Sequence, residues 1–177
     1  MVFRQSHRPV PPPAQRMLVR ARRFIQISRF GKAAALLAEL ANQVEMAGRP
    51  KAAAELHARA AYCYIEAGIG SAALAESEFA LVSFQQAGLA ERFVRFQGNI
   101  LRKMQAYGMQ AGVDALRARF GAEAAVNPQS QAVTQGKPLI LPAACPQCGA
   151  PVRSDEIEWI DARSGECAYC GAIIEAQ

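Results

Sequence analysis

This 177-residue chain lacks any long uninterrupted run of apolar residues. A helix that crosses a bilayer needs roughly 18 or more predominantly apolar residues in succession, and no segment approaches that length. The start of the chain also lacks the apolar core of a secretory signal, because Arg20, Arg22 and Arg23 interrupt its only candidate. We therefore expect a cytoplasmic protein, and attachment to a membrane is disfavoured.

Motifs of the common enzyme classes are also missing. The chain contains no nucleophile elbow, phosphate-binding loop or metalloprotease helix motif. It has only two histidines, and His57 has no cysteine or carboxylate partner at ligand spacing. We interpret His57 as a surface or interface residue and expect a protein without enzymatic activity.

Acidic residues are absent from the first 38 positions, which carry seven arginines and one lysine and therefore a net charge of +8. The whole chain is only +5 at pH 7, so the remainder is acidic. From residue 143 to the end, two arginines face six acidic residues, which gives −4. Because phosphate binding needs cationic side chains near the contact, only the N-terminal region offers a surface for nucleic acid.

Two stretches of the chain place arginines on one face of an expected helix. Arg16, Arg20 and Arg23 share one face of the segment 16–29, and apolar residues share another. This segment is either the first helix of a bundle with a solvated arginine face, or an amphipathic helix that lies on an anionic membrane or a partner. The two arginine faces together form a candidate basic patch. The second face consists of Arg92, Arg95 and Arg102.

Glycine recurs every 20 residues in the segment 16–120, which is rich in alanine and nearly free of proline. The positions are Gly48, Gly68, Gly88 and Gly108. Glycine just past a helix end adopts the left-handed conformation that closes the helix, so this spacing predicts helices of about 15 to 17 residues joined by short turns. Two apolar stripes between residues 71 and 87 predict a helix that is covered on two sides. Overall we predict a mainly α fold of about six antiparallel helices.

Two helices and about 40 residues per unit resemble a tetratricopeptide-type or related helical-hairpin array, in which each pair packs against the next. In that family small residues let paired helices approach closely, and Ala41, Ala53 and Ala60 occupy similar places in the first pair. The second pair departs from the family pattern, because Phe93 stands where a small residue is expected. The resemblance covers residues 32–107, and a plain helical bundle remains the alternative.

Composition divides the chain into four parts. Residues 1–15 form an arm rich in proline and arginine that does not begin a regular helix. Residues 16–120 form the helical domain, and residues 121–142 form a linker that contains Asn-Pro and Gly-Lys-Pro sequences. Residues 143–177 form a small module that contains four of the five cysteines.

These four cysteines stand in two Cys-x-x-Cys pairs, each followed by glycine. Such spacing lets two thiolates on one tight turn bind a tetrahedral metal ion. The pairs resemble the knuckles of zinc ribbons, and the whole chain resembles a bacterial-type protein in which tetratricopeptide-like hairpins precede a C-terminal zinc ribbon. The resemblance implies one structural Zn²⁺. Its ligands would be Cys145, Cys148, Cys167 and Cys170.

The segments around the cysteine pairs predict a small three-stranded module. Alternating polar and apolar residues favour a half-buried strand over 156–159, and Ser164–Gly165 favours a turn. A closing strand is expected at Ile173–Ile174. We expect Trp159 to pack in the core of the module rather than to serve as an exposed binding anchor, and Cys63 to pack in the helical core.

Two other assignments of the paired cysteines stay open. They could form two disulfides, although a cytoplasmic location disfavours this. Their Cys-Pro-x-Cys-Gly sequence also resembles a rubredoxin knuckle, which would hold iron for electron transfer, although the gap of 18 residues between the pairs is shorter than in a rubredoxin. Because protein sulfur fills all four positions, neither metal would keep an open site for a catalytic water.

These observations favour a non-catalytic zinc-binding adaptor that mediates protein–protein interactions. The first alternative is a nucleic-acid-associated regulatory factor that uses the basic N-terminal region. The acidic charge of the cysteine module disfavours a phosphate contact through that module. The second alternative is a rubredoxin-like iron protein for electron transfer.

Overall fold

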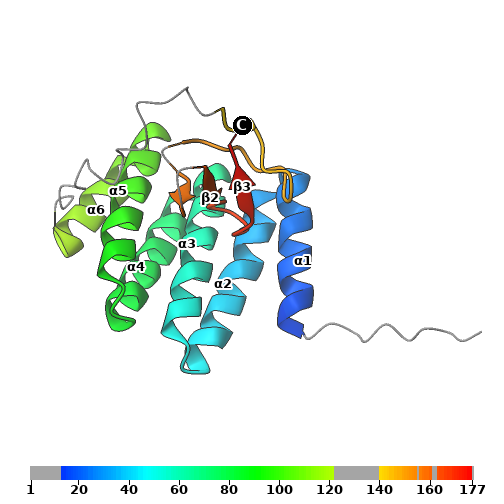
Figure 1. The fold of residues 1–177 in the computed structure, drawn as a ribbon. Coiled ribbons are helices and arrows are strands. Elements are labelled where there is room, and N and C mark those ends of the chain that lie inside the picture. The colour runs from blue at the N-terminus through cyan, green and yellow to red at the C-terminus, as the bar shows by residue number, and fades with distance from the viewer. Residues whose placement is uncertain (1–12, 122–139, 155, 161–162, 177) are drawn as a thin grey trace, which may run out of the picture.

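The structure, a computed structural model, describes residues 13–121, 140–154, 156–160 and 163–176. Most of the predicted N-terminal arm and nearly all of the predicted linker lie outside these residues. The described part of the chain is mainly α, as predicted, with six helices and a small antiparallel sheet (Figure 1). The helices are α1 (Pro13–Gln26), α2 (Phe30–Met46), α3 (Pro50–Glu66), α4 (Gly70–Gln86), α5 (Ala90–Ala106) and α6 (Gln110–Phe120).

The glycines between α2 and α6 close their helices as predicted. The Gly48 N–H donates to the Glu45 carbonyl at 2.8 Å, and the Arg49 N–H donates to the Val44 carbonyl at 3.2 Å. The other three turns repeat this pattern, and all four glycines have φ between 69° and 71°. Glycine adopts such angles without a steric penalty. Helices α2 to α5 have 17 residues each, which confirms the predicted length.

The same turn occurs once more, between α1 and α2, where the sequence has serine instead of glycine. Ser28 lies 20 residues before Gly48 and has φ of 55°. The N–H groups of Ser28 and Arg29 donate to the carbonyls of Ile25 and Phe24 at 2.9 Å and 2.8 Å. The 20-residue spacing therefore includes α1, which glycine positions alone did not reveal.

Helix α1 begins at Pro13, three residues before the predicted start at Arg16. A proline in the first turn of a helix loses no intrahelical hydrogen bond, and its fixed φ suits the helix. The prediction that the arm extends to residue 15 is therefore wrong for residues 13–15, and residues 1–12 lie outside the described part.

Alanine side chains fill the core between α2, α3 and α4. Ala41, Ala53 and Ala60, which the family resemblance placed between paired helices, are fully buried. Small side chains let the helix backbones approach closely. Between α4 and α5 large rings fill the space instead, with the centroids of Phe84 and Phe96 5.8 Å apart. Fewer backbone positions of these two helices therefore lie close together.

The prediction of two covered stripes on α4 is wrong for one of them. Leu81 and Phe84 of the first stripe are buried, but Phe79 of the second stripe is 48% exposed. Phe79 packs beside the ring of His57 on α3, with the ring centroids 5.2 Å apart. The side of α4 that carries Phe79 therefore faces outward.

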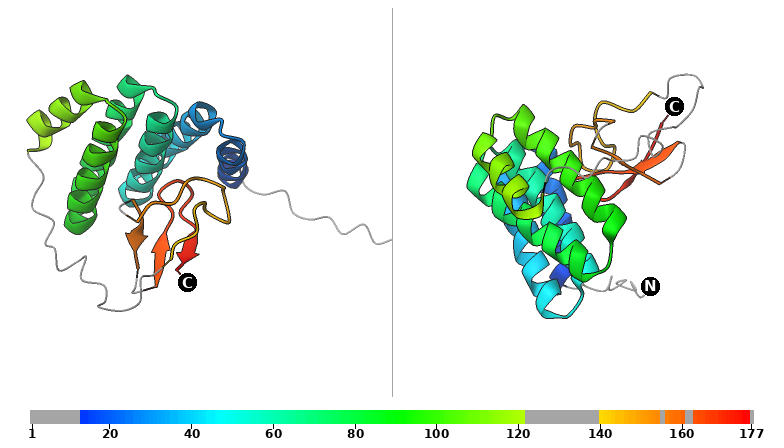
Figure 2. Two further views of the ribbon diagram at one scale, coloured as in Figure 1. Left: turned by 90° about the horizontal axis from the view of Figure 1, so that it is seen from above. Right: turned by 90° about the vertical axis from the view of Figure 1, so that its left-hand side faces the viewer.

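Successive helices lie side by side in an arc, and the C-terminal module lies in the hollow of this arc (Figure 2). Helix α2 packs against α1 and α3, and α3 packs against α4. Side chains of the module join the same buried hydrophobic cluster as those of the helices. Among the residues that the structure describes, no helix combines the length and the apolar character needed to cross a membrane.

The module contains a three-stranded antiparallel sheet in the order β1-β2-β3. Its strands are β1 (Glu158–Trp159), β2 (Ser164–Glu166) and β3 (Ile173–Glu175). The three-stranded layout is confirmed, but Ser164–Gly165 belongs to the central strand and not to a turn. Gly165 pairs with Trp159 on one side and Ile174 on the other. Because cross-strand partners share a face, the glycine leaves room there for its two larger neighbours.

Candidate metal centre

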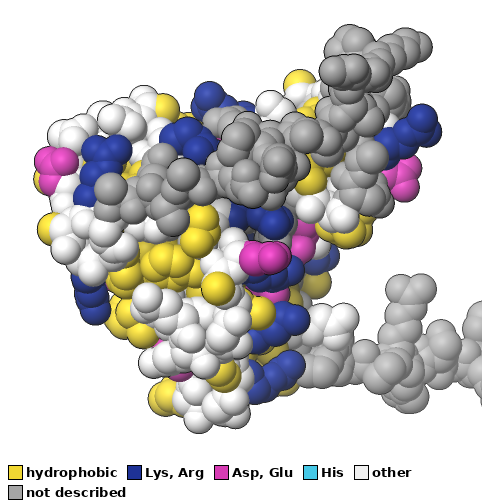
Figure 3. Space-filling model, turned by 60° about the vertical axis from the view of Figure 1, so that its left-hand side comes forward, with side chains coloured by type: hydrophobic (Ala, Val, Ile, Leu, Met, Phe, Trp, Pro, Cys, Tyr) yellow, Lys and Arg dark blue, Asp and Glu magenta, His cyan; other side chains and the backbone are white. Residues whose placement is uncertain are grey.

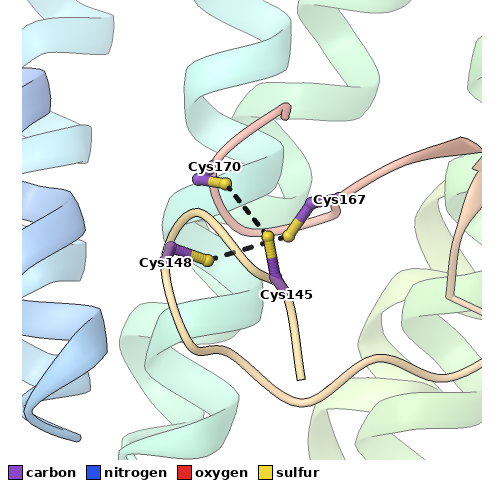
Figure 4. Close-up of side chains that lie close together, drawn as sticks. All are labelled: Cys145, Cys148, Cys167 and Cys170. Atoms are coloured by element: carbon purple, nitrogen blue, oxygen red, sulfur yellow. Dashed lines mark hydrogen bonds between the residues drawn. The ribbon is translucent and has the colours of Figure 1, made fainter. Parts of the chain in front are cut away.

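The two Cys-x-x-Cys turns share one backbone conformation. In the first turn the Gly149 N–H donates to the Cys145 carbonyl at 2.8 Å, and in the second the Gly171 N–H donates to the Cys167 carbonyl at 2.8 Å. Both glycines have positive φ, 71° and 68°, as expected for tight turns. The two turns point their cysteine side chains toward one another (Figure 4).

The four sulfur atoms form a compact buried cluster. Sγ of Cys145 lies 3.8 Å from Sγ of Cys170, and Sγ of Cys148 lies 3.9 Å from Sγ of Cys167. All four sulfur atoms lie within 4.8 Å of one another. A tetrahedral site with metal–sulfur bonds of about 2.3 Å has sulfur–sulfur edges of about 3.8 Å. The cluster therefore fits one tetrahedral metal ion.

Hydrogen bonds around the cluster favour negative charge on sulfur. The thiols of Cys148 and Cys167 and the Ala172 N–H donate to Cys170, which holds the pKa of the Cys170 thiol well below its ordinary value. A bound divalent cation would favour the thiolate form of all four cysteines for the same electrostatic reason. Such a metal would hold the two turns together, because four sulfur ligands leave no position for a reacting water.

The geometry also bears on the alternative assignments of the cysteines. All four are free thiols, and their spacings are much longer than a disulfide bond of about 2.05 Å. The arrangement therefore does not support two disulfides. A tetrahedral set of four sulfur atoms accommodates zinc and iron alike.

A buried lysine that the sequence pattern did not reveal fastens the cysteine module to the helices. Lys103 of α5 is 3% exposed, and its ammonium donates to Glu66 at 2.8 Å, to Glu156 at 2.7 Å and to the Tyr169 hydroxyl at 2.9 Å. The hydroxyls of Tyr169 and Tyr107 each donate to Glu66 at 2.7 Å. We name these five residues the Lys103 network. It joins two residues of the module to three residues of α3 and α5 and its C-terminal turn.

The Lys103 network shifts the pKa values of its members. Burial by itself would raise the pKa of Glu66, but hydrogen bonds from Lys103, Tyr169 and Tyr107 lower it below the ordinary carboxyl value. Burial, together with the hydrogen bond to Glu66, raises the pKa of Tyr107 to about 12. Burial, together with the nearby carboxylate of Glu156, raises the pKa of Tyr169 as well. Both hydroxyls therefore remain hydrogen-bond donors at neutral pH.

The position of Glu156 corrects a prediction. It was assigned to the polar side of a strand over 156–159, but it is 6% exposed and lies in the Lys103 network. The Glu156 N–H donates to the Arg153 carbonyl at 3.0 Å, so the chain turns here and the strand begins only at Glu158. One signal for the network was present in the sequence, since a tyrosine between two ligand cysteines carries a polar group into the site.

Further polar contacts join the module to α1 and α3. The donors and acceptors are Arg59 to Glu166 (2.8 Å), Gln26 to the Gln147 carbonyl (3.0 Å) and Arg22 to the Cys170 carbonyl (3.4 Å). The Arg59 guanidinium also lies directly over Gly171, where a β-carbon would collide with it. Gly171 therefore serves both the turn and the close approach of α3.

His57 is not a surface residue, which corrects the sequence-based interpretation. It is fully buried in α3, and its Nδ1 lies 2.7 Å from Oε2 of Glu76 on α4. Oε2 of Glu45 on α2 lies 3.8 Å from Nε2, which has no hydrogen-bond partner. The two carboxylates come from neighbouring helices, so spacing along one helix did not reveal them. They lie on opposite sides of the ring and do not converge on a common point.

Cys63 and Trp159 were both expected in a core. Cys63 is fully buried, which confirms the prediction, and burial raises the pKa of its thiol. A buried thiol of this kind is chemically inert. Trp159 is half-buried and packs against the core cluster, so the prediction for this residue is confirmed only in part.

The two arginine faces lie apart in the structure. The α1 arginines at positions 16, 20 and 23 are exposed, whereas Arg92 on α5 forms an ion pair with Glu55 and Arg102 donates to Asn99 at 2.6 Å. Helices α2 to α4 lie between α1 and α5 in the arc (Figure 2). In the view of Figure 3, basic side chains lie beside acidic ones and beside exposed hydrophobic ones. The structure thus does not join the two faces into one basic patch.

Comparisons of this chain with models of protein families, with curated proteins and with solved structures find no match. The assignment of the metal centre therefore depends on the four sulfur atoms and their surroundings.

Proposed function

We propose that this protein is a non-catalytic adaptor that binds one structural zinc ion and contacts other proteins through its tetratricopeptide-like helical array and its zinc ribbon. The buried set of four sulfur atoms at tetrahedral spacing carries this proposal. A module of about 35 residues has too small a core to fold unaided. Structural zinc contributes about 10–16 kcal/mol to comparable small sites, so the metal would hold the ribbon together.

The surroundings of the site support a structural role for the metal. The Lys103 network and Arg59 fasten the second cysteine turn to the helices, and no water-accessible coordination position remains. A free-thiol cluster of this kind suits a reducing compartment, in keeping with a cytoplasmic protein. An extended array of helices with the ribbon in its hollow offers surface for protein partners rather than a catalytic cleft.

Metal analysis tests the proposal directly. The protein is purified without added metal and weighed by native mass spectrometry, and we expect one zinc ion per chain. Cys148→Ser is expected to abolish zinc binding, and Cys63→Ser, which changes a buried cysteine outside the cluster, is expected to retain it. Iron in place of zinc would favour the electron-transfer alternative, and a protein without metal would refute the proposal.

The exposed arginines of α1 favour a second candidate function, which is contact with nucleic acid through the N-terminal region. Binding of this kind weakens steeply with salt, because phosphate contacts release counterions. The test is the affinity for duplex DNA and for RNA across a salt series. A charge-reversal variant with glutamate at Arg16, Arg20 and Arg23 is expected to lose the binding, and absence of salt-dependent binding in the wild type would exclude this function.

A further inference from the structure

The inner side of the helical arc gathers cationic and aromatic side chains from four helices. This set, named the docking face, consists of Arg22, Phe30, Arg59, Tyr62 and Lys103. The Lys103 ammonium lies 5.8 Å from the centroid of the Tyr62 ring, which is within the range of a cation–π interaction. The residues come from positions far apart in the sequence and meet only because the helices curve around the hollow.

The zinc ribbon meets the docking face with side chains of complementary chemistry. Glu156 pairs with Lys103 at 2.7 Å, and Glu166 pairs with Arg59 at 2.8 Å. Tyr169 packs its ring near Tyr62, with the centroids 6.0 Å apart. Two carboxylates and one tyrosine thus account for the charged and aromatic recognition of a ribbon whose net charge is −4. Charge complementarity of this kind selects the partner and its register.

The metal controls whether the ribbon presents these three side chains together. Apart from its cysteines, Ala150 and Tyr169, the fully buried apolar residues of the ribbon are Ile157 and Ile174, and Tyr169 is buried by contact with the helices. Without metal such a small core does not hold a fold. Loss of the metal would separate Glu156 from Tyr169 in space and leave the docking face without its occupant.

The hollow continues beyond the ribbon with the same chemistry. A cleft between the ribbon and the helices is lined by Tyr62, Phe96, Arg92 and Arg95 on the helix side and by Glu166 on the ribbon side. Aromatic rings beside arginines again face this cleft. A segment that entered it would lie directly against the edge of the docking face that the ribbon covers.

We propose that the docking face binds acidic, tyrosine-containing segments of partner proteins, and that the zinc-loaded ribbon is a competing segment of the same chain that covers the face until the metal is lost. This inference builds on the proposed adaptor function and adds the surface, the chemistry of the partner and control by metal. A ligand that binds only the uncovered state has its apparent affinity reduced by the fraction of molecules in that state. Zinc therefore acts as an inhibitor of partner binding.

The experiment uses the full-length protein and a fluorescein-labelled peptide with the sequence of residues 153–171, in which serine replaces both cysteines. This probe carries the acidic residues and the tyrosine of the ribbon but binds no metal. Fluorescence anisotropy is measured with zinc-loaded protein and with chelator-treated protein, up to millimolar concentrations. We expect the metal-free protein to bind at least about tenfold more tightly than the zinc-loaded protein, since zinc lowers the uncovered fraction.

Matched variants separate opening of the face from recognition by the face. Glu156→Gln changes only the ribbon and is expected to increase peptide binding by the zinc-loaded protein. Lys103→Met changes the face and is expected to abolish binding by the metal-free protein, whereas Lys51→Met, at an exposed position outside the face, leaves it unchanged. A scrambled peptide of the same composition in which the acidic residues are replaced by their amides is expected not to bind.

The outcomes distinguish this inference from the proposed function. Equal peptide binding with and without zinc, or binding that survives Lys103→Met, would overturn the docking-face proposal while a protein with one zinc ion per chain kept its adaptor assignment. A protein that retains no metal would overturn both. Circular dichroism of each variant establishes that the helices are intact, so that lost binding is not the result of an unfolded array.

Discussion

Replacing Lys103 by methionine removes the charge that joins the ribbon to the helices while keeping the length of the side chain. The ammonium is almost inaccessible to solvent and pairs with two carboxylates, Glu66 at 2.8 Å and Glu156 at 2.7 Å. It also accepts no substitute from water, because the Glu156 side chain is 5% exposed. The variant therefore leaves two buried carboxylates and the Tyr169 hydroxyl without their common donor.

The expected magnitude follows from the burial of this pair. Removing one partner of a buried ion pair costs about 3–5 kcal/mol, because the remaining charge is left without compensation. The ribbon can escape this cost by leaving the helices, so the loss appears as weaker docking rather than as unfolding of the array. At 1.36 kcal/mol per tenfold change, docking is expected to weaken by roughly two to three and a half orders of magnitude.

The assay follows the two parts of the protein separately in guanidinium titrations at saturating zinc. Trp159, the single tryptophan of the chain, reports on the ribbon by fluorescence, and far-ultraviolet circular dichroism reports on the helices. In Lys103→Met we expect the fluorescence transition to move to lower denaturant while the helical transition moves little. Lys51→Met, the matched control at an exposed lysine, is expected to move neither.

An unchanged fluorescence transition in Lys103→Met would refute the reasoning, because it would mean that the buried pair does not hold the ribbon in place. A double-mutant cycle with Glu156→Gln provides a second check. Residues in direct contact show coupling energies of about 0.5–3 kcal/mol, and we expect a value within this range. Strictly additive effects of the two changes would contradict the 2.7 Å contact between them.

Three further predictions concern the metal turns and the pH dependence of stability. Cys148→Ser should abolish zinc binding in native mass spectra and leave helical circular dichroism intact, and collapse of the helices as well would contradict a separately folding array. Gly171→Ala forces a β-carbon against Arg59 and should weaken zinc retention against a competing chelator, whereas Gly48→Ala, with nothing within 4 Å, should cost only about 1 kcal/mol of helix stability. The pKa of Tyr107 is higher in the folded protein, about 12, than its ordinary value of 10.0, so the stability due to its hydroxyl is fully present below about pH 10 and is lost as the pH rises toward 12. Chemical unfolding across this range should show a shallower decline in Tyr107→Phe, and an identical decline would count against this contribution.

Local features of the chain were predicted well because their physical causes are local. A glycine past a helix end depends on the conformational freedom of one residue, so the four glycines located four turns correctly. The Cys-x-x-Cys pairs likewise depend on spacing within one turn, and all four cysteines meet at one point. Ser28 shows the limit of such signals, because a serine at φ of 55° takes the same position without a compositional mark.

Contacts between distant segments were not predicted. Glu156 and Tyr169 lie 53 and 66 residues from Lys103 in sequence, and nothing near Lys103 marks it as buried. His57 was assigned to the surface because its carboxylate partners stand on neighbouring helices, 12 residues before it and 19 residues after it. A charged residue is buried at little cost only where partners from other elements compensate it, and helix spacing alone does not reveal those partners.

The sequence by itself determined the helix lengths, the turns between helices and the identity of the four sulfur ligands, since each depends on residues within one turn or one helix. Only the tertiary structure decided that the ribbon lies in the hollow of the arc, that the two arginine faces stay apart, and that Lys103 joins the two parts of the chain. These features depend on the curvature of the whole array, because small alanines between α2 and α4 and large rings between α4 and α5 set how far apart the helices lie.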